Sequence, residues 1–257
     1  PHAIVMTRML GGAIAFVAIA RVLGVLRIER RHLPRLVACA ALGVIGNQLL
    51  FINGLAHSTA TNATVLGTTI PLFTVVFAVL LGVEPLRAHR AVGIAIAFSG
   101  AAVLVGVERL STDPEHALGS VLVLLNAASY GLYLVVVRPL ASHYHPMALI
   151  AIFFSIGSVA VAPLGIVAYA DMPALTATDV GYLAFLIAVP TLGAYTLVQW
   201  ALHRAESSMV ASYVYLQPVF AAVGGIFLLD EQLTPRTILA AAIIFIGVAL
   251  ATRRPRQ

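Results

Sequence analysis

The sequence contains no lysine, a single cysteine and only one tryptophan, and charged residues make up just 10% of its 257 positions. Soluble domains of this size carry about 25% charged residues. Hydrophobic residues instead make up 61% of the chain, which is more apolar surface than a soluble domain can bury. We therefore expect lipid to be the solvent around most of this protein.

These scarcities exclude several classes of function. The net charge of +5 reflects 15 arginines against 10 acidic residues. All the arginines but Arg8 lie between the apolar runs or near their ends, so we expect membrane topology signals and no nucleic-acid partner. One cysteine, Cys39, lies inside an apolar run and supplies neither a disulfide framework nor a metal-binding set. The sequence also lacks an HExxH motif, paired DxxD-type carboxylates and a GxSxG elbow. We therefore predict no enzyme, no cofactor and no metal.

Nine apolar runs, joined by short connections, dominate the chain. A run of about 20 residues forms about 30 Å of helix, enough to cross the hydrocarbon core of a bilayer. None of the connections is long enough to hold a soluble domain, so we predict an all-α, polytopic membrane bundle with nine visible helices. The runs cover approximately residues 2–24, 34–55, 61–82, 90–107, 117–138, 147–169, 179–201, 208–229 and 234–252.

The arginines predict the orientation of this bundle. Only Arg109 and Arg236 fall in loops on one side, whereas the alternate loops and the tail collect most of the others. Positively charged loops stay in the cytoplasm, so we expect an inner-membrane protein with a cytoplasmic C-terminus. The arginines on that side are Arg21, Arg27, Arg30, Arg31, Arg35, Arg87, Arg90, Arg138, Arg204, Arg253, Arg254 and Arg256.

The two halves of the sequence resemble each other at a fixed offset. Pro71 and Pro218 stand at the midpoints of two runs and are 147 residues apart, and the same offset separates Glu84 from Glu231 at the ends of those runs. We expect each glutamate to cap the following helix or to meet loop arginines rather than to bind cargo. The coincidence predicts an internal repeat.

We place the repeats at residues 1–112 and 113–257. The second repeat has one more helix than the first, at 117–138, so we expect a further helix upstream of Pro1 and ten in all. Five helices per repeat would insert the halves in opposite orientations, which is the inverted-repeat plan of secondary transporters.

Pro71, Pro190 and Pro218 are among the prolines that fall inside apolar runs. A proline removes one hydrogen bond of the helix and frees the carbonyl four residues earlier, which for Pro218 is that of Val214. Lipid cannot satisfy that carbonyl, so we expect it to face protein or a watery cavity. We predict that these prolines kink their helices and act as hinges.

Two long stretches carry a family resemblance. AESSMVASYVYLQPVFAAVGGIFLLDEQLT and TNATVLGTTIPLFTVVFAVLLGVEPL each combine small residues, a mid-helix proline and a glutamate followed by leucine. This pattern, with the glycine-bearing helices that follow it, resembles the EamA-like branch of the drug/metabolite transporter superfamily. The resemblance covers nearly the whole chain and implies ten spans, two inverted repeats, a central cavity and movement of small metabolites, often outward.

Polar side chains in the middle of membrane spans are candidates for substrate binding, because burying them in lipid is costly. Several occur in pairs four residues apart, which places both members on one face of a helix. We expect them to line one cavity with aromatic and amide groups, although they would equally well join helices by hydrogen bonds. They are Asn47, Gln48, Asn126, Tyr130, Tyr195, Gln199, Tyr213 and Gln217.

Arg8 is the only charged residue well inside an apolar run. A guanidinium in a membrane needs a partner or water. Either Arg8 binds the carboxylate of a substrate, or its side chain extends along the helix to the outer surface.

We therefore predict a secondary transporter that moves small metabolites by alternating access, as an exporter of amino acids or similar neutral or zwitterionic solutes. A multidrug or lipophilic-cation exporter with the same fold is the first alternative, and a non-transporting membrane sensor or assembly subunit is the second. The expected partners are a small-molecule substrate and the lipid bilayer. Proton coupling, through a histidine such as His57 or His203, and the choice between monomer and homodimer stay open.

Overall fold

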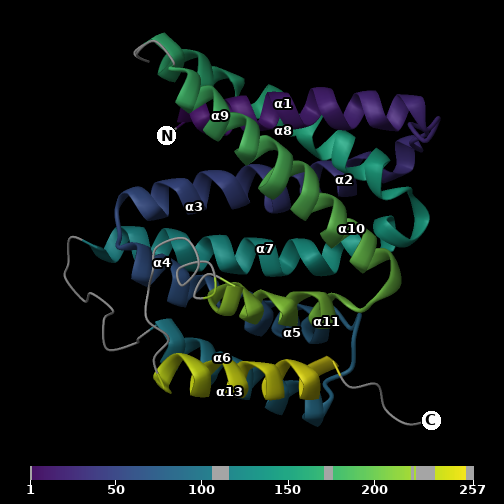
Figure 1. Ribbon diagram of the computed structural model, residues 1–257. Helices are drawn as coiled ribbons and strands as arrows, with labels where there is room; N and C mark the ends of the chain where they lie inside the picture. Colours follow the sequence, from purple (N-terminus) through teal and green to yellow (C-terminus); the bar gives the residue numbers. More distant parts are fainter. Residues whose placement is uncertain (1, 106–115, 171–175, 221–222, 224–234, 253–257) are drawn as a thin grey trace. The chain divides into compact units, whose positions relative to one another are not determined.

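The computed structural model describes residues 2–105, 116–170, 176–220, 223 and 235–252, and these residues form helices and short connections without a strand (Figure 1). The chain divides into two compact units. Unit 1 comprises Pro1–Ile52 and Val136–Ala205, and unit 2 comprises Asn53–Val135 and Glu206–Gln257. Each unit is described by itself below.

Unit 1 is built around α1 and α8, which run side by side and share the most extensive helix pairing in the unit (Figure 1). Gly12 lies against Phe154, and Gly165 lies so close to Met6 that a Cβ at position 165 would overlap its side chain. The elements are α1 (His2–Val22), η1 (Arg30–His32), α2 (Leu33–Ala40), η2 (Ala41–Gly46), the start of α3 (Asn47–Ala56), the end of α7 (Ala117–His143), α8 (Pro146–Ala170), α9 (Ala177–Leu186), η5 (Ile187–Gly193) and α10 (Ala194–Arg204).

Unit 2 is built in the same way around α6 and α13 (Figure 1). A Cβ on Gly247 would lie only 2.3 Å from the backbone nitrogen of Ala97, so the two helix backbones touch. Small residues permit such close approach in membrane proteins. The elements are the end of α3, α4 (Ala60–Gly67), α5 (Ile70–Leu80), α6 (Ala88–Val105), the start of α7, α11 (Ser207–Ser212), η6 (Tyr213–Leu216) and α13 (Pro235–Thr252).

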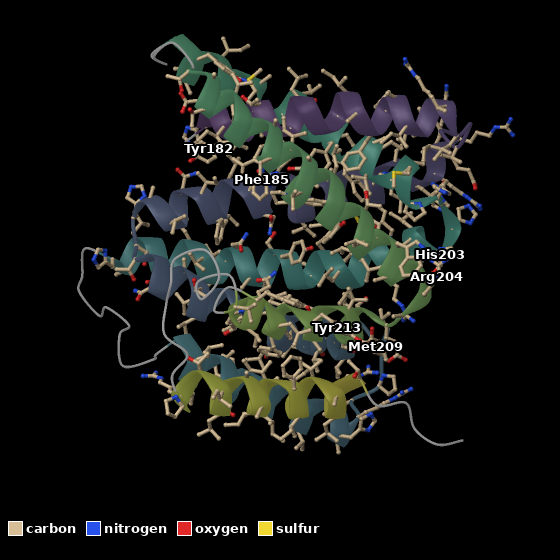
Figure 2. All side chains as sticks on the ribbon, viewed as in Figure 1. Tyr182, Phe185, His203, Arg204, Met209 and Tyr213 are labelled. Atoms are coloured by element: carbon tan, nitrogen blue, oxygen red, sulfur yellow. The ribbon has the colours of Figure 1, made fainter. Side chains whose placement is uncertain are left out.

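Within the described residues, seven helical stretches are long and apolar enough to cross a membrane, and the apolar helix Ala88–Leu104 is slightly shorter. The prediction of an all-α, polytopic membrane bundle is therefore confirmed. Eight of the nine predicted runs correspond to these stretches, whereas the run 208–229 lies partly outside the described residues. In Figure 2, Tyr182 and Phe185 stand on α9, where both side chains are exposed, as expected for a surface that meets lipid.

Two glycines end helices in the same manner. Gly24 follows α1 with φ 67°, and Gly82 follows α5 with φ 65°. In both cases the glycine N–H bonds the carbonyl three residues back and the next N–H bonds the carbonyl five residues back: Gly24 to Arg21 and Val25 to Ala20, Gly82 to Val79 and Val83 to Ala78. This is the hydrogen-bond pattern of a Schellman C-cap, in which glycine adopts the left-handed conformation without steric cost.

Regular α-helix is interrupted near Pro71, Pro190 and Pro218, whereas α8 continues through Pro163. The run that holds Pro71 ends one helix at Gly67 and begins the next at Ile70, and a 3₁₀ turn, η6, comes directly before Gln217 and Pro218. Both prolines are buried. Pro190 lies inside a π-helical segment, η5. The proposed role of these three residues as hinges stays a prediction.

Each compact unit combines corresponding helices from the two halves of the sequence. Shifted by 147 residues, Ala88 at the start of α6 falls on Pro235 at the start of α13, and these two helices pack together in unit 2. The helices α1 and α8, which correspond with about two residues of slippage, pack together in unit 1. The units seen in space are thus assembled from pieces of both sequence halves.

Candidate functional site

A group of polar side chains in unit 1 gathers around the hydroxyl of Tyr195, near the start of α10. This hydroxyl donates to the backbone oxygen of Gly43 and lies equally far, at 3.4 Å, from Oδ1 of Asn47. Both distances are long for a hydrogen bond between oxygens, which is usually 2.5–3.0 Å. The ring of Phe154 meets the Tyr195 ring edge-on, with centroids 5.0 Å apart. The hydroxyl is therefore held in place but only weakly bonded.

π-helical turns shape both sides of this contact. Gly43 belongs to η2, and Tyr195 follows η5 by two positions. Under the 147-residue offset, Ala41 and Gly46, the ends of η2, fall on Ala188 and Gly193 within η5. Single π turns in long helices are rare and concentrate at functional sites. Each half of the sequence thus has a π-helical turn at the corresponding position.

Gln48 is the sequence equivalent of Tyr195 and lies in the same group. It is only 4% exposed, and its side chain lies within hydrogen-bonding reach of the Tyr195 hydroxyl. Neither its amide nitrogen nor its amide oxygen, however, has a hydrogen-bond partner of normal geometry among the described residues. A buried amide without hydrogen bonds of normal geometry costs about 1–3 kcal/mol. The Gln48 side chain therefore has a donor and an acceptor that a ligand or a water molecule could satisfy.

Arg8 joins the group from α1. Its Nε donates to Oγ1 of Thr191 at 3.2 Å, and that hydroxyl donates in turn to the backbone oxygen of Leu186 at 2.9 Å. Thr191 is fully buried in η5, and Arg8 interacts electrostatically with Tyr195. We call Arg8, Gly43, Asn47, Gln48, Thr191 and Tyr195 the Tyr195 cluster.

None of the described carboxylates pairs with Arg8. The described acidic residues are all engaged elsewhere: Glu29 with Arg31 and His143, Glu84 with Arg90, Glu206 with Arg87 and Arg90, and Asp179 with the N-terminus of α9. In this part of the chain, the positive charge of the Tyr195 cluster has no protein counter-ion. The cluster is therefore suited to an anionic group from outside the protein.

The other predicted binding residues are distributed over both units. Gln199 is fully buried in α10 of unit 1. In unit 2, Asn126 is buried and Tyr130 is half-buried in α7, with the Tyr130 ring 5.5 Å from that of Tyr133.

Tyr213 and Gln217 differ from the rest, because both side chains are exposed on unit 2. Figure 2 shows Tyr213 on the segment that follows α11, with 53% of its surface exposed. The structure thus brings Arg8, Asn47, Gln48 and Tyr195 together, and no contact joins Tyr213 to Gln217.

A second polar group, in unit 2, is tightly bonded. Glu84 is buried, and its Oε2 accepts from Nη1 of Arg90 at 3.0 Å and from the hydroxyl of Ser208. Its Oε1 accepts from the backbone N–H groups of Ser207 and Ser208 at 2.8 and 3.5 Å, at the start of α11. Arg90 also bonds Ser208 Oγ at 2.6 Å and pairs with Glu206. We call these five residues the Glu84 network.

This network matches the expectation that Glu84 caps a helix and meets an arginine, although the helix is α11 and not the next one along the chain, and Arg90 lies in the first turn of α6 and not in a loop. Glu231, the repeat equivalent, lies outside the described residues. Sequence reasoning missed Arg90, Ser207 and Ser208 as partners of Glu84, and it missed Thr191 and Gly43 in the Tyr195 cluster. The only available signal was their position: Thr191 follows Pro190, and the serines begin a helix that opens with small residues.

The helical stretches and the polar groups between them define the class: a multi-pass membrane protein whose spans enclose polar side chains. The chain belongs to the EamA-like transporter family, whose pattern it matches over residues 1–106 and 117–253. The family resemblance expected from the sequence is therefore confirmed. The family and the names of its members indicate transport rather than catalysis.

Several named relatives align over most of the chain. A probable terminal-alkyne amino-acid exporter of Streptantibioticus cattleyicolor is 28% identical over 255 residues, covering 97% of this chain and 83% of the relative. The uncharacterized inner membrane transporter YedA of Escherichia coli K12 is 28% identical over 262 residues, covering 95% and 81%. An uncharacterized transporter of Archaeoglobus fulgidus is 27% identical over 205 residues, covering 79% and 70%.

The fold also matches a crystal structure of a protein. The TM-score is 0.84 at 20% identity, and the match covers 98% of this chain and 87% of the other. At this identity the likeness establishes the fold alone.

Proposed function

We propose that the protein is a secondary transporter that exports amino acids or similar zwitterionic solutes across the inner membrane by alternating access. The observation that carries the proposal is Arg8, a membrane-embedded guanidinium without a counter-ion among the described residues, beside a weakly bonded tyrosine hydroxyl and an amide without a hydrogen bond of normal geometry. A substrate carboxylate would supply the missing negative charge. The relative named as a probable amino-acid exporter supports the same class of cargo.

The polar residues have distinct roles in this proposal. The guanidinium of Arg8 binds the carboxylate. The Thr191 hydroxyl orients the guanidinium by accepting a hydrogen bond from Nε of Arg8. Tyr195 and Gln48 supply a hydroxyl and an amide to the polar part of the solute, with Asn47 and Gln199 beside them. Asn126, Tyr130, Tyr213 and Gln217, which lie in unit 2, are proposed as further contacts for the solute.

The positive charge of Arg8 also separates this function from its closest alternative. A lipophilic cation would be repelled by an uncompensated guanidinium, and no described carboxylate lies near it to attract such a cation. The Arg8 side chain therefore favours a zwitterionic solute over a cationic drug. The two repeats would rock about the segments of Pro71 and Pro218, with the arginine-rich loops and the C-terminus in the cytoplasm.

Counterflow in proteoliposomes tests the proposal. Full-length protein is reconstituted with internal amino acid, and uptake of labelled amino acid is compared with uptake of the matching amine that lacks a carboxylate. We expect exchange of the amino acid alone, and Arg8→Gln should weaken it about 10–100-fold, because a charge-assisted hydrogen bond contributes about 1.5–3 kcal/mol. Arg21→Gln is the matched control, since Arg21 is exposed in the last turn of the same helix.

The alternatives give different results in this experiment. Exchange of lipophilic cations but not of amino acids would identify a multidrug exporter. Sealed vesicles that exchange no solute would favour a sensor or assembly subunit. Amino-acid exchange that persists unchanged in Arg8→Gln would show that the carboxylate is bound elsewhere.

A further inference from the structure

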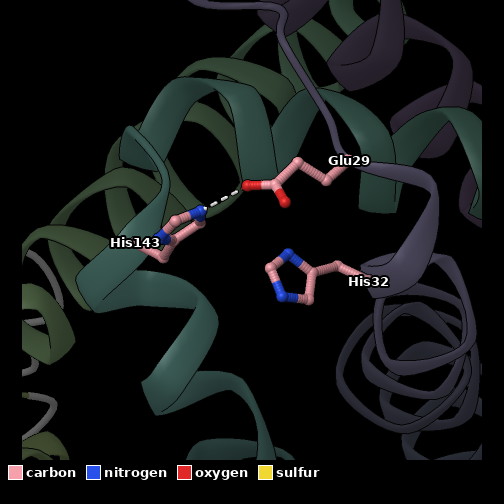
Figure 3. Close-up of side chains that lie close together, drawn as sticks. All are labelled: Glu29, His32 and His143. Atoms are coloured by element: carbon pink, nitrogen blue, oxygen red, sulfur yellow. Dashed lines mark hydrogen bonds and ion pairs between the residues drawn. The ribbon is translucent and has the colours of Figure 1, made fainter.

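Three side chains with metal-binding atoms meet in unit 1, apart from the Tyr195 cluster. Glu29 lies in the linker after α1, His32 ends η1, and His143 ends α7. One ligand atom from each residue lies within 4.8 Å of the other two. Figure 3 shows the His143 ring and the Glu29 carboxylate directed toward each other, with the His32 ring facing both.

The hydrogen bonds within this group already bring two potential ligands together. Nε2 of His143 and Oε1 of Glu29 are 2.8 Å apart, along the dashed line in Figure 3. The rings of His32 and His143 are 5.3 Å apart at 79° to each other. Ligands of a tetrahedral zinc ion, each at about 2.0–2.1 Å from the metal, lie about 3.3 Å from one another. Small side-chain rotations are enough to reach that spacing.

Tyr144 fixes the two chain segments relative to each other. Its hydroxyl lies 2.6 Å from Nδ1 of His32 and accepts the backbone N–H of Glu29 at 3.2 Å. Its ring also meets the rings of both His32 and His143 edge-on. Metal ligands are commonly oriented by such outer partners, so Tyr144 is a positioning residue.

The charges of the group suit a divalent cation. The hydrogen bond from His143, and then that from Arg31, lower the pKa of the Glu29 carboxyl, so the carboxylate is ionised at neutral pH. Arg31 contacts Oε2 at 2.6 Å and leaves Oε1 on the side of the histidines. Imidazole nitrogens are common ligands of transition-metal ions.

The group is open to water. Glu29 and His143 line a surface hollow together with Val25, Arg27, Ile28, Tyr144 and His145. An ion can therefore enter from solvent without crossing lipid. Two imidazole nitrogens and one carboxylate oxygen, with a fourth position open to water, form a ligand set typical of zinc, whereas magnesium and calcium prefer oxygen ligands.

We propose that Glu29, His32 and His143 bind a divalent transition-metal ion, with Zn²⁺ as the best match. The ion links the segment between α1 and α2 to the end of α7 within unit 1. The site uses none of the residues assigned to the transported solute, so metal binding and transport are separate properties.

Zinc titration tests this proposal. Full-length protein without a polyhistidine tag, in detergent, competes for Zn²⁺ with a chromogenic chelator. Loss of an outer partner of a metal typically weakens binding about 10–100-fold, so His32→Ala and His143→Ala should each weaken it at least about tenfold. His145→Ala is the matched control, because His145 lies on the same loop and contributes no ligand atom; it should change affinity by no more than about twofold.

Cobalt gives a second readout that does not depend on affinity. Co²⁺ in a low-symmetry site of nitrogen and oxygen ligands absorbs visible light strongly, and this absorption should disappear in His143→Ala but persist with lower Co²⁺ affinity in Tyr144→Phe. The proposal is overturned if His32→Ala and His143→Ala bind zinc as tightly as the wild type. It is also overturned if His145→Ala loses as much affinity as they do, since any surface histidine would then account for the binding.

Discussion

The two polar groups within the helices differ in how completely their hydrogen bonds are made. In the Glu84 network both carboxylate oxygens accept two bonds each, and of the buried atoms only Nε of Arg90 is left without a partner. In the Tyr195 cluster the hydroxyl bonds are long and the amide of Gln48 has no hydrogen bond of normal geometry. A saturated buried network fixes a structure, whereas an unsaturated one retains capacity for a ligand. The contrast separates a structural group from a candidate binding group.

The largest effect should come from breaking the Glu84 network. Both charged side chains are almost completely buried, with Arg90 4% and Glu84 3% exposed. Arg90→Ala leaves the Glu84 carboxylate buried without its charge partner, which typically costs about 3–5 kcal/mol. Thermal or chemical unfolding in detergent would measure the loss.

Arg87→Ala is the matched control for that variant. Arg87 also pairs with Glu206, but at 3.6 Å and with a side chain that is 31% exposed, so its loss should cost about 1 kcal/mol or less. Equal losses of stability in Arg90→Ala and Arg87→Ala would show that burial does not make the Glu84–Arg90 pair more important than a partly exposed ion pair.

A smaller effect of opposite sign is expected at Gln48. Gln48→Met keeps the size of the side chain and removes an amide that has no hydrogen bond of normal geometry, so the free energy of unfolding should rise by about 1–3 kcal/mol. The same variant should bind the transported solute less tightly, because the amide is lost. Thermal shift with and without amino acid measures both changes.

Gln199→Met is the comparison for Gln48→Met. Within the described part of the chain, both amide atoms of Gln48 lack a hydrogen bond of normal geometry, whereas in Gln199, which is also fully buried, only Oε1 does, so Gln199→Met should lose stability. A loss of stability in Gln48→Met as well would show that the Gln48 amide is satisfied in the folded protein.

The smallest effect is expected at Tyr195. Tyr195→Phe removes two long hydrogen bonds and should change stability by less than about 0.5 kcal/mol. If the hydroxyl contacts the solute, the apparent affinity in counterflow should fall about 3–10-fold, the equivalent of one ordinary hydrogen bond. A large loss of stability without a change in affinity would assign Tyr195 to packing.

The helices could be predicted from the sequence because lipid imposes a length and a composition on every span. The runs at 2–24, 117–138 and 147–169, for example, correspond to α1, α7 and α8. Arg8 and Tyr195 were recognisable as candidates for the same reason, since polar groups are conspicuous in apolar runs.

The partners of these residues could not be predicted in the same way. Thr191 and Gly43 join the Tyr195 cluster through π turns, and apolar periodicity does not distinguish a π turn from ordinary helix. The prediction of no metal-binding set was based on short sequence motifs. His143 stands more than one hundred positions from Glu29 and His32 in the sequence, so no short motif contains all three residues. Contacts over such separations depend on packing.

The pairing of α1 with α8 has a consequence for biosynthesis. Translation at roughly 5–20 residues per second completes α8 about 150 residues, and so about 7–30 seconds, after α1. During that interval the glycine-bearing face of α1 that later receives Phe154 is without its permanent neighbour. The newly made α1, which carries Arg8, must therefore be in contact with lipid or with the insertion machinery until α8 leaves the ribosome.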